Sequence, residues 1–323
     1  MSAKPKVFVT RLIQKEIMDV ISEQSIMDIW PQKEPIPYEK LLDKVRTVSG
    51  IYCQTTDRLD TNFFNAAKEL KVVAVVGTGT DNIDLETATK RGIVVGNTPG
   101  VTAKSTADMA LGLLLSTARN IPTSQKWLRE GNWKHDLAPM GWLGPEVQGS
   151  TLGLIGIGKI GTEVAKRAKG FDMKILYFSR TRKVDLEESL NLIWTNSLDD
   201  LLKQSDFVSL HVPLTKETKY IISKKELEKM KPTSILINTS RGPVVNQKDL
   251  YEALKEKTIS AAGLDVQEIE PIPLTDSILS LDNVVLTPHL GTATHKTRSI
   301  MAKMALENLL AGLSNEKLPF PVN

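Results

Sequence analysis

Residues 151–161 read Thr-Leu-Gly-Leu-Ile-Gly-Ile-Gly-Lys-Ile-Gly, and this stretch decides the fold. Its apolar first half predicts a buried β-strand, and residues 162–169 are compatible with a helix. Gly156 permits a tight turn, Gly158 lets the backbone approach a pyrophosphate, and Gly161 lets the helix pack close to the strand. A helix N-terminus also offers unpaired amides and a partial positive charge to an anion. The stretch therefore predicts a dinucleotide-binding turn, made by Gly156, Gly158, Lys159, Ile160 and Gly161.

Six strand-like stretches follow one another from residue 151 onward, and helix-compatible residues separate most of them. They cover residues 151–155, 173–178, 207–212, 234–239, 259–266 and 283–287. Strands that alternate with helices form a parallel sheet covered on both faces. The sequence thus predicts a doubly wound α/β domain of the Rossmann type, with six strands.

The N-terminal part of the chain has the same alternation on a smaller scale. Short apolar runs at residues 6–10, 50–53, 72–76 and 92–95 predict a small parallel α/β unit. A cluster of helix-breaking residues at 97–100 precedes a helix-compatible stretch, so we expect a domain boundary near residue 100. A last helix is predicted over residues 292–313, with Gly312 near its end as a stop signal.

Composition excludes several classes of protein. The 323 residues suffice for two domains, and 41 basic against 38 acidic residues leave no basic stripe for nucleic acid. Apolar runs stay far below the ~20 residues that cross a bilayer, and no signal peptide follows Met1, so we expect a cytoplasmic protein without a membrane span. The single cysteine, Cys53, and the four histidines show no metal-ligand spacing, so no metal is predicted.

The second predicted strand ends in a segment at the position where dinucleotide-binding domains contact the ribose of the cofactor. NAD-binding domains carry Asp or Glu there to hold the 2′-hydroxyl, and this sequence has none. Two arginines could pair with a 2′-phosphate, and two hydroxyls could donate to it. The segment therefore favours NADP(H) over NAD(H), with a solvated basic loop as the alternative, and the candidate residues are Ser179, Arg180, Thr181 and Arg182.

Polar residues follow the ends of the later strands, where ligands of open α/β sheets bind. We expect Arg241, Asp265 and His289 to converge there. Hydride transfer to a ketone needs a proton donor, and His289 is the candidate. Arg241 could grip a carboxylate and polarise a carbonyl group, which implies a 2-keto acid substrate. An acidic partner for His289 would lie in the loop after the fifth strand, at Glu268 or Glu270.

The other histidines have simpler interpretations. His211 follows the third predicted strand, where it either lines the adenine side of the cofactor or serves the structure. His135 and His295 are expected at the surface.

These residues together resemble the D-isomer-specific 2-hydroxyacid dehydrogenase family over nearly the whole chain. The glycine turn, Asn-Thr-Ser-Arg-Gly at 238–242, Gly-Leu-Asp-Val at 263–266, Glu270-Pro271 and Thr-Pro-His-Leu-Gly at 287–291 match it in order and spacing. Residues 177–182 and 288–295 are most similar to its NADPH-preferring glyoxylate reductase/hydroxypyruvate reductase branch. The resemblance implies NADPH-dependent reduction of small 2-keto acids, glyoxylate to glycolate and hydroxypyruvate to D-glycerate.

The resemblance also implies roles for single residues. Arg241, Glu270 and His289 form the implied catalytic set, with His289 as the acid and Glu270, rather than Glu268, as its partner. The cofactor would further contact Thr106, Pro213, Thr239, Ser240, Arg241, Asp265, His289 and Gly291, although Pro213 stands where some relatives carry a hydroxyl residue. The substrate would be held by backbone amides in the loop 77–84, at Thr78 and Gly79, and by Arg241 and His289.

Architecture and assembly follow from the same resemblance. It implies two Rossmann/flavodoxin-like parallel-sheet domains: a discontinuous substrate domain, residues 1–101 and 291–323, and an NADP-binding domain, residues 102–290. It implies a homodimer, for which the helix 106–117 with Trp127 and Trp133 could supply the surface. Trp142 resembles an aromatic residue that reaches the partner's substrate pocket, and an interface or core position is the alternative.

Rival activities share the same motifs. Phosphoglycerate, D-lactate and formate dehydrogenases resemble this chain, but the basic segment 179–182 differs from their usual NAD pattern. A dinucleotide-sensing corepressor is a rival of another class, and the NADPH-type loop argues against it.

Overall fold

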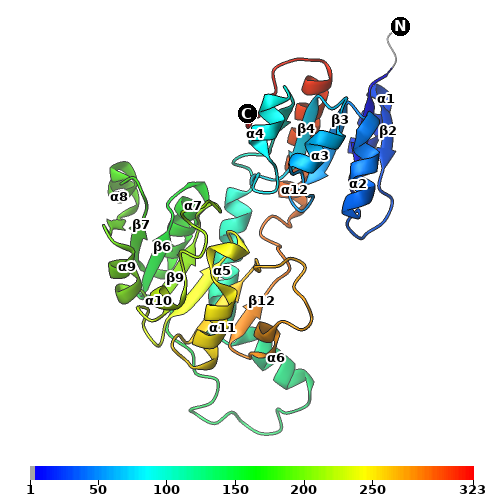
Figure 1. The fold of residues 1–323 in the computed structure, drawn as a ribbon. Helices are drawn as coiled ribbons and strands as arrows, with labels where there is room; N and C mark the ends of the chain where they lie inside the picture. The colour runs from blue at the N-terminus through cyan, green and yellow to red at the C-terminus, as the bar shows by residue number, and fades with distance from the viewer. Residues whose placement is uncertain (1–3) are drawn as a thin grey trace. The chain divides into compact units, whose positions relative to one another are not determined.

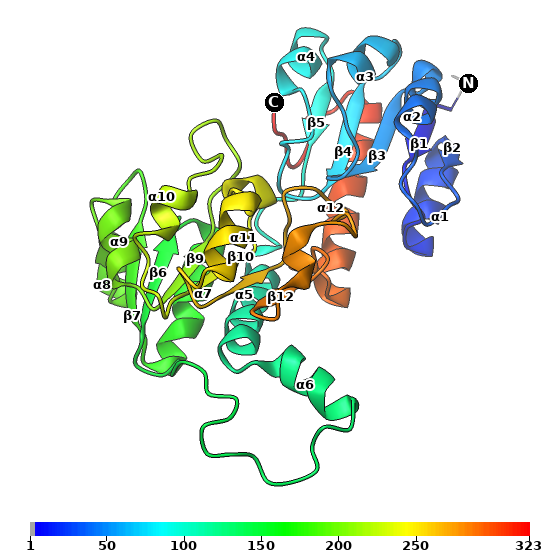
Figure 2. The same cartoon turned by 60° about the horizontal axis from the view of Figure 1, so that its bottom comes forward.

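The computed structural model describes residues 4–323 and divides into two compact units (Figures 1 and 2). The terminal unit comprises the described residues up to Thr102 together with Ala293–Asn323, and the central unit comprises Ala103–Thr292. Each unit is built on its own parallel sheet, so the fold is α/β with two parallel-sheet domains, as predicted.

The terminal unit has a five-stranded sheet in the order β2-β1-β3-β4-β5. Its strands are β1 (Lys6–Val9), β2 (Ile26–Ile29), β3 (Gly50–Gln54), β4 (Val72–Val76) and β5 (Val94–Gly96). Its helices are α1 (Lys15–Gln24), α2 (Tyr38–Lys44), α3 (Thr61–Ala66), α4 (Leu85–Lys90) and α12 (His295–Leu313). Helices α1 and α12 bury their apolar residues on one face of the sheet, and α2 to α4 cover the other.

The central unit has a seven-stranded parallel sheet in the order β12-β11-β10-β9-β6-β7-β8. Its strands are β6 (Thr151–Ile155), β7 (Lys174–Phe178), β8 (Ile193–Trp194), β9 (Phe207–Leu210), β10 (Ile235–Asn238), β11 (Ala261–Leu264) and β12 (Val284–Leu286). The prediction of six strands was therefore wrong by one. The missed strand, β8, has two residues at the sheet edge, too few for a period-2 pattern to show.

Helices cover both faces of this larger sheet. They are α5 (Ala103–Ala118), α6 (Ile121–Arg129), α7 (Lys159–Ala168), α8 (Val184–Leu190), α9 (Leu198–Gln204), α10 (Lys224–Leu227) and α11 (Gln247–Lys255). Helices α5 and α7 pack into one apolar cluster, and α9, α10 and α11 into the other. Leu111, Leu113 and Leu114 of α5 are buried inside the unit.

The glycine turn between β6 and α7 leaves no room for larger residues at two positions. Gly156 has a φ of +95°, and a Cβ there would lie 2.7 Å from the carbonyl oxygen of His211. A Cβ on Gly161 would lie 2.3 Å from the carbonyl oxygen of Gly156. Gly158 precedes α7 and has open space where a side chain would stand. The turn thus brings the chain close to β9 and opens the N-terminus of α7 toward solvent.

Among residues 4–323, no helix has the length and apolar character that a bilayer crossing requires. No group of three or more His, Cys, Asp or Glu side chains within these residues is arranged to hold a metal ion.

Candidate active site

The loop after β12 carries His289, and its imidazole meets a carboxylate from the loop after β11. His289 Nδ1 lies 2.8 Å from Oε2 of Glu270, and the backbone amide of Gln267 donates to the other oxygen of that carboxylate, at 3.0 Å. Burial would raise the pKa of Glu270, but the hydrogen bond and charge of His289 outweigh it, and the pKa lies below its usual value. A carboxylate in this state orients the ring and stabilises the protonated imidazole.

Glu268, the other acidic candidate in this loop, faces elsewhere. It accepts hydrogen bonds from the hydroxyl of Tyr220 and from the backbone amide of Gln247. The structure thus brings His289 to Glu270 and leaves Glu268 in a separate group of contacts.

Asp265 fixes the backbone around His289. It is buried at the end of β11, and its two carboxylate oxygens accept from the amides of Leu290 and Gly291, at 2.6 and 2.7 Å. The Thr287 hydroxyl donates to it as well, and its backbone carbonyl accepts from the amide of His289. His289 itself has a φ of +55°, a left-handed conformation that these bonds hold in place. The sequence predicts Asp265 at this strand end, as a cofactor contact, but not these hydrogen bonds (the Asp265 clamp), which depend largely on backbone amides.

Arg241 lies where the sequence placed it, three residues after β10. Asn238 fixes the turn there: its amide group donates to the carbonyl of Arg241 at 3.0 Å, and its oxygen accepts from the amide and hydroxyl of Ser240. The guanidinium donates to the carbonyl of Ser240, at 2.9 Å, and its charge contributes to lowering the pKa of Glu270 after the contribution of His289. Glu270 therefore lies within electrostatic range of both other catalytic candidates, His289 and Arg241.

Several candidate cofactor residues line the same sheet edge. Thr106 of α5 lies beside Gly291. A Cβ added to Gly291 would be 3.4 Å from the side chain of Thr106. Thr239 is buried at the end of β10, and its hydroxyl has no hydrogen-bond partner among residues 4–323. An unpaired buried hydroxyl and the open turn at Gly158 both fit a polar ligand such as a dinucleotide.

His211 packs against the glycine turn at the end of β9. Its Nε2 shares a 2.9 Å hydrogen bond with the hydroxyl of Ser209, while its Nδ1 is buried with no partner in the described chain. Burial lowers the pKa of His211 to about 3, so the ring is neutral at physiological pH. Two residues further on, the carbonyl of Pro213 accepts from the Thr218 hydroxyl.

The two arginines after β7 have different environments. Arg180 is exposed and makes no hydrogen bond or ion pair within residues 4–323. Arg182 is bound by Glu187, with its Nη2 2.7 Å from Oε2. Ser179 directly precedes Arg180, and its hydroxyl donates to the carbonyl of Thr181, at 2.7 Å, which closes a small turn.

The substrate candidates Thr78 and Gly79 belong to the terminal unit and follow β4. The Thr78 hydroxyl donates to the carbonyl of Thr98 at 3.0 Å, and its own carbonyl accepts from the side chain of Asn97. The backbone amides of Thr78 and Gly79 donate to nothing in the part of the chain that is described, as an anion-binding loop requires.

Trp142 lies in the long segment between α6 and β6. Its ring packs edge-on against Trp127 of α6 in the same chain, with centroids 5.7 Å apart, and 38% of the residue is exposed.

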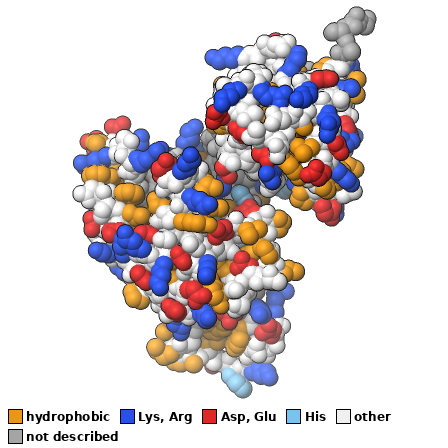
Figure 3. All heavy atoms as spheres, viewed as in Figure 1, with side chains coloured by type: hydrophobic (Ala, Val, Ile, Leu, Met, Phe, Trp, Pro, Cys, Tyr) orange, Lys and Arg blue, Asp and Glu red, His pale blue; other side chains and the backbone are white. Residues whose placement is uncertain are grey.

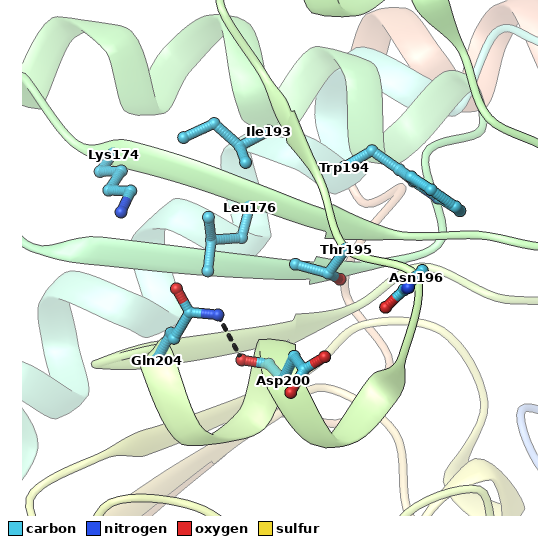
Figure 4. A pocket seen from close by; sticks show the side chains of 8 residues that line it. All are labelled: Lys174, Leu176, Ile193, Trp194, Thr195, Asn196, Asp200 and Gln204. Carbon is cyan, nitrogen blue, oxygen red and sulfur yellow. Dashed lines mark hydrogen bonds between the residues drawn. The ribbon is translucent and has the colours of Figure 1, made fainter.

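A shallow surface pocket lies at the opposite edge of the central sheet (Figure 4). It is lined by Lys174, Leu176, Ile193, Trp194, Thr195, Asn196, Asp200 and Gln204. Strands β7 and β8 form it, whereas His289 and Glu270 follow β12 and β11, so the pocket is separate from the candidate active site.

Comparison with known proteins agrees with this geometry. Residues 111–291 match the family model described as D-isomer specific 2-hydroxyacid dehydrogenase, NAD binding domain. A glyoxylate reductase of Korarchaeum cryptofilum is 48% identical over 320 residues, which cover 99% of this chain and 96% of that protein.

Solved structures show the same fold. A protein from Thermus thermophilus superimposes with a TM-score of 0.91 at 41% identity, over 98% of this chain and 100% of that one. An NADPH-dependent glyoxylate/hydroxypyruvate reductase from Sinorhizobium meliloti, in complex with NADP and malonate, gives a TM-score of 0.86 at 33% identity, over 99% and 97% of the two chains. The chain therefore belongs to the D-isomer specific 2-hydroxyacid dehydrogenase family.

Proposed function

We propose that this chain is an NADPH-dependent reductase of small 2-keto acids that converts glyoxylate to glycolate and hydroxypyruvate to D-glycerate. The observation that carries the proposal is the His289–Glu270 pair at the carboxyl edge of a dinucleotide-binding sheet. Similarity to a glyoxylate reductase and to a glyoxylate/hydroxypyruvate reductase supports the choice of substrates.

A bound nicotinamide cofactor supplies the hydride in this reaction. The chain supplies the proton, which passes from the imidazole of His289 to the carbonyl oxygen of the substrate as the alkoxide develops. Glu270 stabilises the protonated ring before transfer, and the Asp265 clamp keeps the ring in place. Arg241 polarises the carbonyl and balances negative charge on the substrate.

Cofactor binding is assigned to residues around the turn and at the strand ends. Amides at the N-terminus of α7 would hold the pyrophosphate, and Arg180 and Ser179 would contact the 2′-phosphate. Thr106, Thr239, His211 and Gly291 would line the rest of the site. In the terminal unit, we assign the free amides of Thr78 and Gly79 to the substrate carboxylate.

The substrate and cofactor assignments are tested by a panel of 2-keto acids. Absorbance of NADPH and of NADH is followed with glyoxylate, hydroxypyruvate and pyruvate. Fast turnover of the first two with NADPH supports the proposal. Cofactor binding without turnover would instead indicate a dinucleotide sensor, and equal turnover with NADH would contradict the choice of cofactor.

The proton donor is tested by His289→Ala. Turnover should fall by about 10²- to 10⁴-fold, while the dissociation constant of NADPH, measured by fluorescence, changes little. Retained turnover would exclude His289 as the acid.

We further propose that the chain forms a homodimer through α6 and the segment that follows it. Apolar side chains gather at the surface there (Figure 3), and the exposed ones are Ile121, Leu128, Trp133, Leu137, Met140, Trp142 and Leu143. An apolar surface of this kind marks a protein interface. Sedimentation should give a dimer for the wild type and a monomer for Met140→Glu with Leu143→Glu, whereas Leu274→Glu, which alters an exposed leucine elsewhere, should stay dimeric.

A further inference from the structure

The side chain of Arg182 is held by a carboxylate from the next helix. Glu187 of α8 accepts from the Nε of Arg182 at 2.9 Å through one oxygen and from Nη2 at 2.7 Å through the other. A planar pair of this kind fixes both position and orientation of the guanidinium. The side chain of Glu187 is 14% exposed, whereas that of Arg182 is 55% exposed, so the pair lies at the surface of the unit with Glu187 on its inner side.

Two aromatic residues complete the attachment. The hydroxyl of Tyr177, which is fully buried in β7, donates to Glu187 at 2.6 Å and accepts from the backbone amide of Lys183 at 2.8 Å. The Arg182 guanidinium also lies over the ring of Trp194 in β8, 5.3 Å from its centroid. Hydrogen bonds from Arg182 and Tyr177 hold the pKa of Glu187 down to about 2, so the carboxylate is charged at every physiological pH.

These contacts attach one end of the segment 179–183 to the sheet and leave the other end open. Arg182 and the amide of Lys183 are both tied to the Tyr177–Glu187 pair. Arg180 is exposed, and its charge adds to the hydrogen bond of Thr215 in lowering the pKa of Glu217. A loop fixed in this way has a restricted backbone at Ser179 and Arg180, and it loses less entropy when an anion binds than an unattached loop would.

We propose that Glu187 is a positioning residue for NADPH selectivity. By holding Arg182, Glu187 fixes the loop 179–183 so that Ser179 and Arg180 face the 2′-phosphate. The inference rests on the proposed use of NADPH. In this inference, Arg182 supports the loop and does not itself bind the phosphate. The inference also explains why an acidic residue, Glu187, stands close to a proposed phosphate site.

The charge of Glu187 makes the proposal sharply testable. If the carboxylate acted through its charge alone, its removal would strengthen binding of a 2′-phosphate, since a nearby negative charge repels an anion. A positioning role predicts weaker binding of the 2′-phosphate, because without the carboxylate of Glu187 the side chain of Arg182 no longer fixes the loop. The sign of the change in affinity therefore separates the two explanations.

The experiment measures binding of 2′,5′-ADP and of 5′-AMP by calorimetry in the full chain. Glu187→Gln should raise the dissociation constant of 2′,5′-ADP by about tenfold, as expected for a lost charged hydrogen bond, and leave that of 5′-AMP within about twofold. The matched control is Glu188→Gln, which removes the same charge from the adjacent, exposed position in α8 and should not weaken binding of 2′,5′-ADP.

Tyr177→Phe provides a second variant that keeps the buried ring and removes only the hydroxyl. It should weaken 2′,5′-ADP in the same direction, so the proposal stays testable if Glu187→Gln does not fold. In steady state, both variants should raise KM for NADPH without lowering kcat.

The outcomes separate this inference from the proposed function. A wild-type chain that binds 2′,5′-ADP no better than 5′-AMP overturns the choice of NADPH. A wild-type chain that prefers 2′,5′-ADP, with Glu187→Gln or Tyr177→Phe binding it equally well or more tightly, overturns the positioning role alone.

Discussion

His289 Nδ1 and Glu270 Oε2 lie 2.8 Å apart, although 19 positions of chain separate the two residues. The pair forms because β11 and β12 are neighbours in the central sheet, so that the loops after them meet at one edge. The pKa of Glu270 is lowered, so its carboxylate is ionised and can stabilise a protonated imidazole.

Glu270→Gln tests the electrostatic part of this pair. The amide keeps the size of the side chain but no longer stabilises the protonated ring, so kcat should fall at least about tenfold. The matched control is Glu268→Gln, whose carboxylate contacts Tyr220 and not His289. An unchanged kcat in Glu270→Gln would contradict the pairing as a functional contact.

Arg180→Asp tests how the cofactor is selected. The new carboxylate would repel a 2′-phosphate and could accept from a ribose 2′-hydroxyl, so KM for NADPH should rise by about 10- to 100-fold while NADH improves. Steady-state kinetics with both cofactors measure the change. Lys183→Asp makes the same charge change three residues away and should have a much smaller effect. Unaltered preference in Arg180→Asp would refute the assignment.

The sequence predicted central strands much better than edge strands. The predicted ranges for β4 and β6 match the structure residue for residue, because strands covered on both faces read as continuous apolar runs. Strands β2 and β8 were not predicted. Both lie at sheet edges, and their exposed apolar residues, such as Ile26 and Ile193, carry no clear burial pattern.

Contacts within the candidate site were only partly predictable. Motif position identified the loop that pairs with His289, but the residues alone left Glu268 and Glu270 open, since the choice depends on how the loop turns. The Asp265 clamp relies on backbone amides, which every residue except proline has, so the sequence gives no sign of it. The attachment of Arg182 to Glu187 joins a loop to a helix five residues on, and a basic segment gives no sign of which arginine is tied down.

Gly161→Ala tests the close approach of α7 to the glycine turn. Alanine in a helix is favoured over glycine by about 1 kcal/mol, which taken alone would stabilise the variant. The added Cβ would, however, lie 2.3 Å from the backbone oxygen of Gly156, which cannot move without opening the turn. We expect a net loss of about 1–3 kcal/mol in the free energy of unfolding and weaker nucleotide binding.

The control for that variant is Gly170→Ala, where nothing lies within 4 Å of the added methyl group. It should unfold at the same denaturant concentration as the wild type or at a higher one. Equal stability of the two variants would show that the turn accommodates a side chain at Gly161.

His211 should make the fold sensitive to acid. Its pKa falls from 6.5 to about 3 on burial, so below pH 6.5 the unfolded chain takes up a proton that the folded chain does not. The neutral His211 ring therefore contributes fully to the free energy of unfolding above pH 6.5. The contribution is lost as the pH falls toward 3, by roughly 1.4 kcal/mol per pH unit at most. In His211→Gln, the free energy of unfolding should therefore decline less between pH 7 and pH 4 than in the wild type, as measured by denaturant titration at each pH. His295→Gln alters an exposed histidine and should follow the wild type; a decline as steep in His211→Gln would mean that the ring already takes a proton in the folded state.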